Sequence, residues 1–304
     1  MVGSHTRIEQ EIAKLEEAIA YLASEFEHTY QNYLTALGKV VRQELILACY
    51  HICTQAYPDA FLLLSFRERE KLQQDLKNLA LASQNKLQNL VGQVNGDLIN
   101  EEKEDDEDDE DDEDDQDDQD DQDDEDDDFD LEEERETEEK LEESHAIVLS
   151  IRTPERLIRW QEAIEKGLIQ IIKNLSQNAN RRLQQSSILP KRLPEQVLDA
   201  ASKAEAAGET IPGPKNLLTL VLETVQSEEG ENNGIETTTL HIVAIHLRLG
   251  EIEFSEGNLN SSRHQIRNLS AKLYNLRRDY QKKLRERAVV EAESAWRASW
   301  YDDR

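Results

Sequence analysis

The chain is poor in the residues that build sheet-rich or cross-linked folds. Aromatic residues make up 5% of its 304 positions, and the two cysteines, Cys49 and Cys53, give no disulfide framework. The six prolines, at positions 58, 154, 190, 194, 212 and 214, all lie outside the strong helical patterns. Because good helix formers such as Leu, Ala, Glu, Gln and Arg are abundant, the composition predicts an all-α fold of long helices.

Long apolar runs are also missing. The longest ones, such as FLLL at 61–64 and IVAI at 242–245, are far too short to cross a bilayer. No charged-then-apolar leader follows Met1, so we expect no secretory signal. These features predict a cytoplasmic protein without a membrane span.

The sequence lacks the motifs of common catalytic sites. The patterns GxGxxG, GxxxxGK[ST] and GxSxG do not occur. Cys49 and Cys53 lack the further ligands that zinc requires, and no carboxylate completes a zinc motif with His241 and His246. We expect buried free cysteines and ordinary, partly buried histidines. The sequence therefore predicts a non-enzymatic protein without a metal or cofactor.

Bases are nearly absent from residues 101–143, where 33 acids meet only Lys103, Arg135 and Lys140. Residues 104–127 are eight triplets, five EDD and three QDD. Such a block repels itself and has too little apolar area to bury, so we expect 99–143 to be a disordered acidic linker. It could recruit a basic protein surface, or it could be a repeat expansion that adds only solubility.

Apolar residues at coiled-coil spacing are the main positive signal near the N-terminus. Their intervals are 4, 3, 4, 3 and 4, at Ile8, Ile12, Leu15, Ile19, Leu22 and Phe26. A capping box of Thr6 and Glu9 predicts where this helix begins, and Pro58 ends it, with a break near Gly38 as an option.

A second capping box predicts another helix. It joins Ser65 to Glu68, and the helix that follows closes between Gly92 and Gly96. Residues 1–98 are therefore expected to form a helical hairpin.

The C-terminal region, 144–304, repeats this pattern. Thr153-Pro154-Glu155 predicts a helix start. A last helix over about 262–300 carries apolar residues at intervals of 3, 4, 3 and 4, at Ile266, Leu269, Leu273, Leu276 and Tyr280. We call each of these rows of apolar residues a seam. The N-terminal and C-terminal seams have the same spacing, so we expect long antiparallel helices in which this region packs back on the N-terminal helices or on a second copy. Residues 237–254 fit both a strand and a helix, and a helix is favoured.

Two groups on the last helix are candidate binding residues. Six bases fall within 277–287, namely Arg277, Arg278, Lys282, Lys283, Arg285 and Arg287. They could contact nucleic acid, an anionic membrane or an acidic partner, but an exposed charged helix face is the favoured interpretation. Trp296 and Trp300 share a helix face and are either core anchors or partner anchors.

Two patches, ACYHICTQAYPDAFLLLSFREREKLQQDL at 48–76 and EAESAWRASWYDD at 291–303, resemble uncharacterised conserved proteins of cyanobacteria. The resemblance covers about a quarter of the chain and contains no catalytic motif. It implies an intracellular bacterial protein and assigns no functional residue.

The favoured function is a helical scaffold or assembly adaptor that self-associates or binds protein partners. The acidic tract would take part in that binding. The alternative is a nucleic-acid-associated regulator that uses the basic C-terminal helix, with the acidic tract as an internal competitor.

Overall fold

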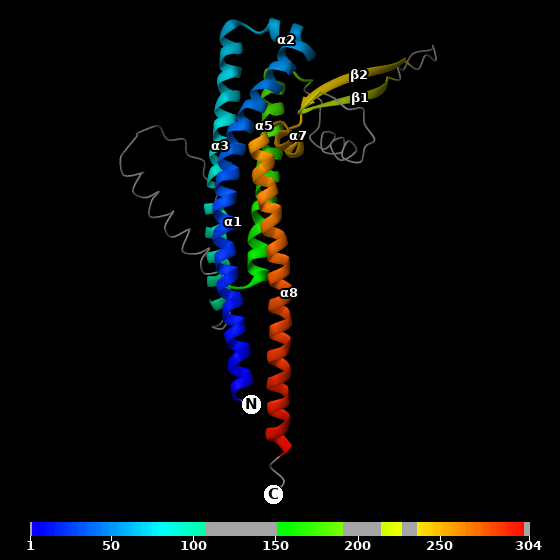
Figure 1. The fold of residues 1–304 in the computed structure, drawn as a ribbon. Coiled ribbons are helices and arrows are strands. Elements are labelled where there is room, and N and C mark those ends of the chain that lie inside the picture. The colour runs from blue at the N-terminus through cyan, green and yellow to red at the C-terminus, as the bar shows by residue number, and fades with distance from the viewer. Residues whose placement is uncertain (1, 108–150, 191–213, 227–235, 301–304) are drawn as a thin grey trace, which may run out of the picture. The chain divides into compact units, whose positions relative to one another are not determined.

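The computed structural model describes residues 2–107, 151–190, 214–226 and 236–300 (Figure 1). In chain order the elements are α1 (Val2–His51), the π-helix η1 (Ile52–Ala56), α2 (Pro58–Leu63), α3 (Phe66–Glu107), α5 (Pro154–Gln185), β1 (Leu217–Gln226), β2 (Glu236–Ile245), α7 (Leu249–Ser255) and α8 (Gly257–Trp300). Long helices dominate, which confirms the predicted fold class. Residues 108–143, most of the acidic segment, lie outside the described residues.

The described residues divide into two compact units. Unit 1 takes its residues from Met1–Tyr30, Asn89–Glu165 and Gln265–Arg304. Unit 2 takes them from Gln31–Gln88 and Lys166–His264. The expected division into 1–98, 99–143 and 144–304 stays a prediction.

In unit 1, α1 and α8 run antiparallel and side by side (Figure 1). Glu11 pairs with Lys283 at 2.7 Å, and Glu25 pairs with Lys272 at 3.3 Å, so residue numbers rise in α1 as they fall in α8. The predicted seams face inward. Their buried members are Ile8, Ile12, Ile19, Leu22 and Phe26 in α1 and Ile266, Leu269, Leu273 and Tyr280 in α8.

An aromatic cluster forms the centre of unit 1. Trp160 packs edge-on against Phe26 and Tyr30, with ring centroids 6.5 and 5.8 Å away. Its indole N–H donates to Asn95 Oδ1 at 2.6 Å, and the Tyr30 hydroxyl donates to Glu165 at 2.6 Å. The polar tips are therefore satisfied while the rings stay out of water.

Unit 2 begins with the rest of α1 packed on α3. The expected break near Gly38 is absent, because α1 continues to His51. A Cβ added at Gly38 would lie 3.0 Å from Cγ of Gln84, so the glycine allows the two helices to approach closely. The Ser65–Glu68 capping box is confirmed, whereas α1 begins at Val2 rather than at Thr6 and α3 continues past Gly96 to Glu107.

The helix favoured over 237–254 is wrong for most of that stretch. Residues 236–245 form β2, which pairs antiparallel with β1 from Leu217↔Ile245 to Gln226↔Glu236. Only the short helix α7, from Leu249, lies where a helix was expected. The strand forms because β1 and β2 are both rich in Thr, Val, Leu and Ile and satisfy one another's backbone hydrogen-bonding groups.

Two buried asparagines hold the base of this hairpin. Asn180 on α5 donates to the carbonyl of Ile245 at 2.8 Å and accepts from its N–H at 2.9 Å, so it acts as one more rung of the sheet. Asn216 has a φ of 58° and is 1% exposed. Its side chain donates to Glu44 at 2.7 Å and accepts from the N–H of Arg248 at 3.2 Å.

Candidate protein-binding groove

A groove opens in unit 2 where the end of α1 faces the start of α3. It encloses about 360 Å³. Side chains from α1, η1, α2 and α3 line it, namely Ile46, Cys49, Tyr50, Cys53, Thr54, Phe61, Leu72, Gln73, Leu76 and Lys77. Because α1 and α3 are antiparallel in this unit, the apolar faces of two helices meet along the groove.

Two thiols form part of the floor. Cys49 and Cys53 are free and buried, as predicted. Burial raises the pKa of Cys53 to about 11 and that of Cys49 further still. Both thiols are therefore protonated near neutral pH, where they behave as small apolar side chains rather than nucleophiles.

The segment 46–66 supplies six of the ten residues that line the groove, and it is rich in exposed apolar residues, which we call the rim; of these, Ile46 and Tyr50 line the groove itself. Six of the thirteen large apolar side chains that are exposed among the described residues fall within 46–66. These six are Ile46, Leu47, Tyr50, Leu62, Leu63 and Phe66, and Leu63 is 87% exposed. A concentration of this kind marks an interaction surface more often than scattered single residues do.

Local hydrogen bonds fix the corner that carries α2. Arg69 on α3 donates to the carbonyls of Phe61 and Leu62 at 3.1 and 2.6 Å, and its guanidinium lies 5.4 Å from the Phe61 ring centroid. The Tyr57 hydroxyl accepts from the N–H of Val243 at 2.9 Å. The rim is thus held in place before any partner binds, which lowers the entropy cost of binding.

Lys77 is the only charged residue that lines the described groove, and Thr54 and Gln73 are the other polar ones. This chemistry suits a ligand that is mainly apolar and carries one acidic group. The groove was hard to predict, because its apolar residues lie in helical patterns that also fit a core.

The six predicted bases on α8 lie in unit 1, and four of them pair with carboxylates. Arg277 pairs with Glu155 at 3.5 Å and Arg278 with Asp279 at 3.5 Å. Lys283 pairs with Glu11 at 2.7 Å and Arg287 with Glu291 at 3.6 Å.

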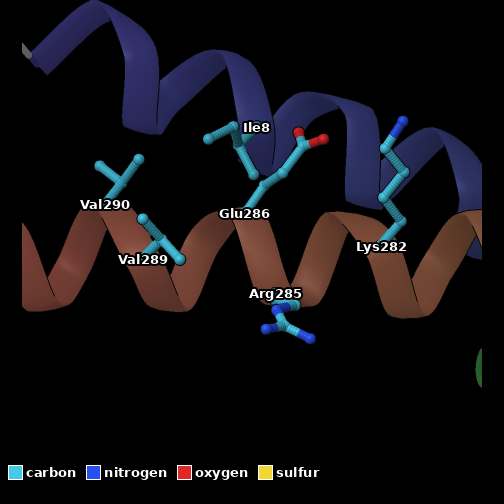
Figure 2. A pocket seen from close by; sticks show the side chains of 6 residues that line it. All are labelled: Ile8, Lys282, Arg285, Glu286, Val289 and Val290. Carbon is cyan, nitrogen blue, oxygen red and sulfur yellow. The ribbon is translucent and has the colours of Figure 1, made fainter.

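The other two bases line a second hollow. Lys282 and Arg285 border it together with Ile8, Glu286, Val289 and Val290 (Figure 2). Trp296 is 67% exposed, so it is not a core anchor. The side chain of Trp300 lies outside the described residues.

His241 and His246, the two histidines singled out in the sequence, differ in their exposure. His241 is exposed, not partly buried as expected, and His246 is partly buried. In the described parts of the chain, no group of three or more His, Cys, Asp or Glu side chains is placed to hold a metal ion.

No protein family, curated protein or solved structure matches the chain. Within the described residues, no helix is both long enough and apolar enough to cross a membrane.

Proposed function

We propose that this protein is a non-enzymatic helical adaptor whose groove between α1 and α3 binds an amphipathic helix of a protein partner. The observation that carries the proposal is the exposed apolar rim around an apolar floor. In this arrangement the apolar face of the partner's helix enters the groove, which is a common mode of peptide recognition.

The dimensions of the groove define the ligand. The lining residues of α1 and η1 run from Ile46 to Thr54, which is about 12 Å of helix. A partner helix of two to three turns matches this length and presents apolar anchors at intervals of three, four and seven residues. An acidic residue beside these anchors would pair with Lys77.

The chemistry of the floor supports binding rather than catalysis. The two thiols in the groove lining, Cys49 and Cys53, are buried, and burial raises the pKa of both. Such thiols are poor nucleophiles near neutral pH, whereas their polarizable sulfur atoms suit contact with apolar side chains.

The test compares proteins that co-purify with the full chain at its natural expression level. A double variant, Ile46→Glu and Tyr50→Glu, places two charges on lining residues of the groove that are exposed, so the fold should survive. Phe254→Glu is the matched control, because Phe254 is 86% exposed and does not line the groove. Quantitative mass spectrometry should find a stoichiometric partner with the wild type and the control but not with the double variant.

Retention of the same partners by all three proteins would contradict the groove as the binding site. The absence of any stoichiometric protein from the wild-type preparation would contradict the adaptor function itself. The nucleic-acid alternative has less support, because four of the six predicted bases pair with carboxylates.

A further inference from the structure

The two cysteines of unit 2 lie on one side of the helix that they share. Cys49 is near the end of α1, Cys53 is in η1, and both line the groove. In an α-helix, side chains four residues apart share a face but are about 40° out of line. The π-helical turn reduces this offset, because it is wider, as the hydrogen bond from Tyr57 N–H to the Ile52 carbonyl five residues back shows. The two thiols therefore lie almost in line along the groove.

The pair is free and close together. Cys49 is 7% and Cys53 is 8% exposed, and neither forms a disulfide. Burial raises the pKa of Cys49, and the neighbouring Cys53 raises it further, because two thiolates so close together repel one another. A single cation between the two sulfur atoms would remove this repulsion.

The donor atoms select the kind of cation. Among the ten lining residues there is no His, Asp or Glu, so the groove offers two sulfur ligands and no third side chain of those types. Zinc takes four protein ligands in structural sites and three in catalytic ones, so this pair is too small for it. Monovalent copper prefers soft thiolate ligands and is stable with only two of them, one on either side of the metal.

The groove also contains a counter-charge. A copper(I) ion held by two thiolates carries a net charge of −1, because one positive charge meets two negative ones. Lys77 is the only charged residue that lines the groove, and its charge is positive. It therefore offsets the charge of the complex within surroundings that are otherwise mainly apolar.

We propose that Cys49 and Cys53 bind one copper(I) ion between their sulfur atoms, with Lys77 as the counter-charge. Each thiol releases its proton to solvent, two copper–sulfur bonds form, and no electron is transferred. The metal-free protein predicted from the sequence rested on the ligand requirements of zinc, which a two-coordinate ion does not share. The site uses the floor of the groove alone and does not depend on a protein partner.

Anaerobic competition with bicinchoninate, a coloured chelator of copper(I), tests the site in the reduced full chain. The chain contains only these two cysteines, so the wild type should withdraw one copper(I) per chain from the chelator. Cys49→Ala and Cys53→Ala should each lose this binding. Circular dichroism checks that each variant is folded.

X-ray absorption of the copper-loaded wild type reports the ligands without any substitution. It should show two sulfur ligands, and the sedimentation coefficient should be the same with and without copper, because both ligands belong to one chain. This measurement remains decisive if an alanine variant is unstable.

The counter-charge is tested on α3. Lys77→Gln should weaken copper binding by about 3-fold, since ion pairs near solvent contribute little. Lys71→Gln is the matched control, because Lys71 is exposed on the same helix and does not line the groove. Equal affinity of these two variants would remove Lys77 from the site.

Three results overturn the copper site. They are a wild type that leaves all copper with the chelator, copper ligands other than two sulfur atoms, and copper that joins two chains. None of them bears on the adaptor function, which is tested by partner binding without added metal.

Discussion

The aromatic cluster of unit 1 and the groove of unit 2 contain similar side chains, but those of the cluster are buried and those of the groove are open to solvent. Around Trp160, every ring is fully buried, and the indole N–H and the Tyr30 hydroxyl have buried or partly buried hydrogen-bond partners. In the groove, Tyr50 is exposed, and Phe61 borders an open space. Apolar surface that is sealed contributes to folding, whereas the same surface left open is available to a partner.

Removing one ring from each region gives the largest expected contrast. Trp160→Ala should lower the free energy of unfolding by about 3–5 kcal/mol, because it leaves a cavity in the core. Tyr50→Ala should change it by less than about 0.5 kcal/mol, because the ring is exposed. Urea denaturation of both variants measures the difference. Similar losses for the two variants would break the comparison.

Substitutions of Asn216 test whether unit 2 also contains a buried polar residue that contributes to folding stability. Asn216→Gly keeps the positive φ but removes two buried side-chain hydrogen bonds, so it should cost about 2–4 kcal/mol. Asn216→Ala should cost about 1 kcal/mol more, because alanine is strained at this φ. Equal stability of the wild type and the glycine variant would show that the side chain does not hold the hairpin.

The acidic segment should matter little to either region. Deleting residues 104–127 removes a charged block without apolar residues. The free energy of unfolding should therefore change by less than about 1 kcal/mol, which corresponds to about 2–4 °C in Tm. Far-UV circular dichroism during heating measures this effect. A loss of many degrees would show that the segment is part of the folded core.

The same deletion tests the nucleic-acid alternative. If the tract competes for the basic residues of α8, the deleted form should bind DNA more tightly at low salt, and the difference should fade as salt rises. Equal DNA binding by both forms would show that the acidic tract does not compete for the basic residues of α8.

The smallest effect concerns a partly exposed ion pair of unit 1. Hydrogen bonding to Lys283 lowers the pKa of Glu11, so the pair stabilises the fold above the ordinary glutamate pKa and is lost as pH falls through the lowered value. Glu11→Gln should therefore lower Tm slightly near pH 7 and converge with the wild type near pH 2. Glu17→Gln, at an exposed position on the same helix, is the control.

The sequence predicted the elements whose signals are local. The heptad spacing of Ile8 to Phe26 and of Ile266 to Tyr280 identified both seams, and Thr153-Pro154-Glu155 marked the start of α5. Ser65 and Glu68 marked the start of α3. In each case the signal is a spacing or a capping pair within one short stretch of sequence. The helix can therefore be predicted without knowing which distant residues it contacts.

The hairpin escaped prediction because its signal is not local. Residues 237–245 fit both periodicities, and only their pairing with 217–226 decides for a strand. Asn180 and Asn216, which anchor the hairpin, looked like ordinary helix and connector residues. A usable signal was present, since two stretches rich in Thr, Val, Leu and Ile flank the Gly- and Asn-containing loop at 227–234.

The groove was only partly predictable. A run such as FLLL at 61–64, followed by Phe66, cannot bury every side chain on one helix face, so some exposed apolar surface was implied. Which residues face out depends on how α1 and α3 pack and on the clamp that Arg69 places on α2. Those contacts are tertiary and leave no spacing pattern in the sequence.

The most direct test of the adaptor function is site-specific photo-cross-linking in the native cell. A photoreactive phenylalanine analogue replaces Tyr50 at the groove, and the same analogue replaces Phe254 in the control. We predict a cross-link from position 50 alone, to a partner segment whose apolar residues recur at intervals of three or four beside an acidic residue. Equal cross-linking from both positions, or none from position 50, would contradict the groove as the binding site.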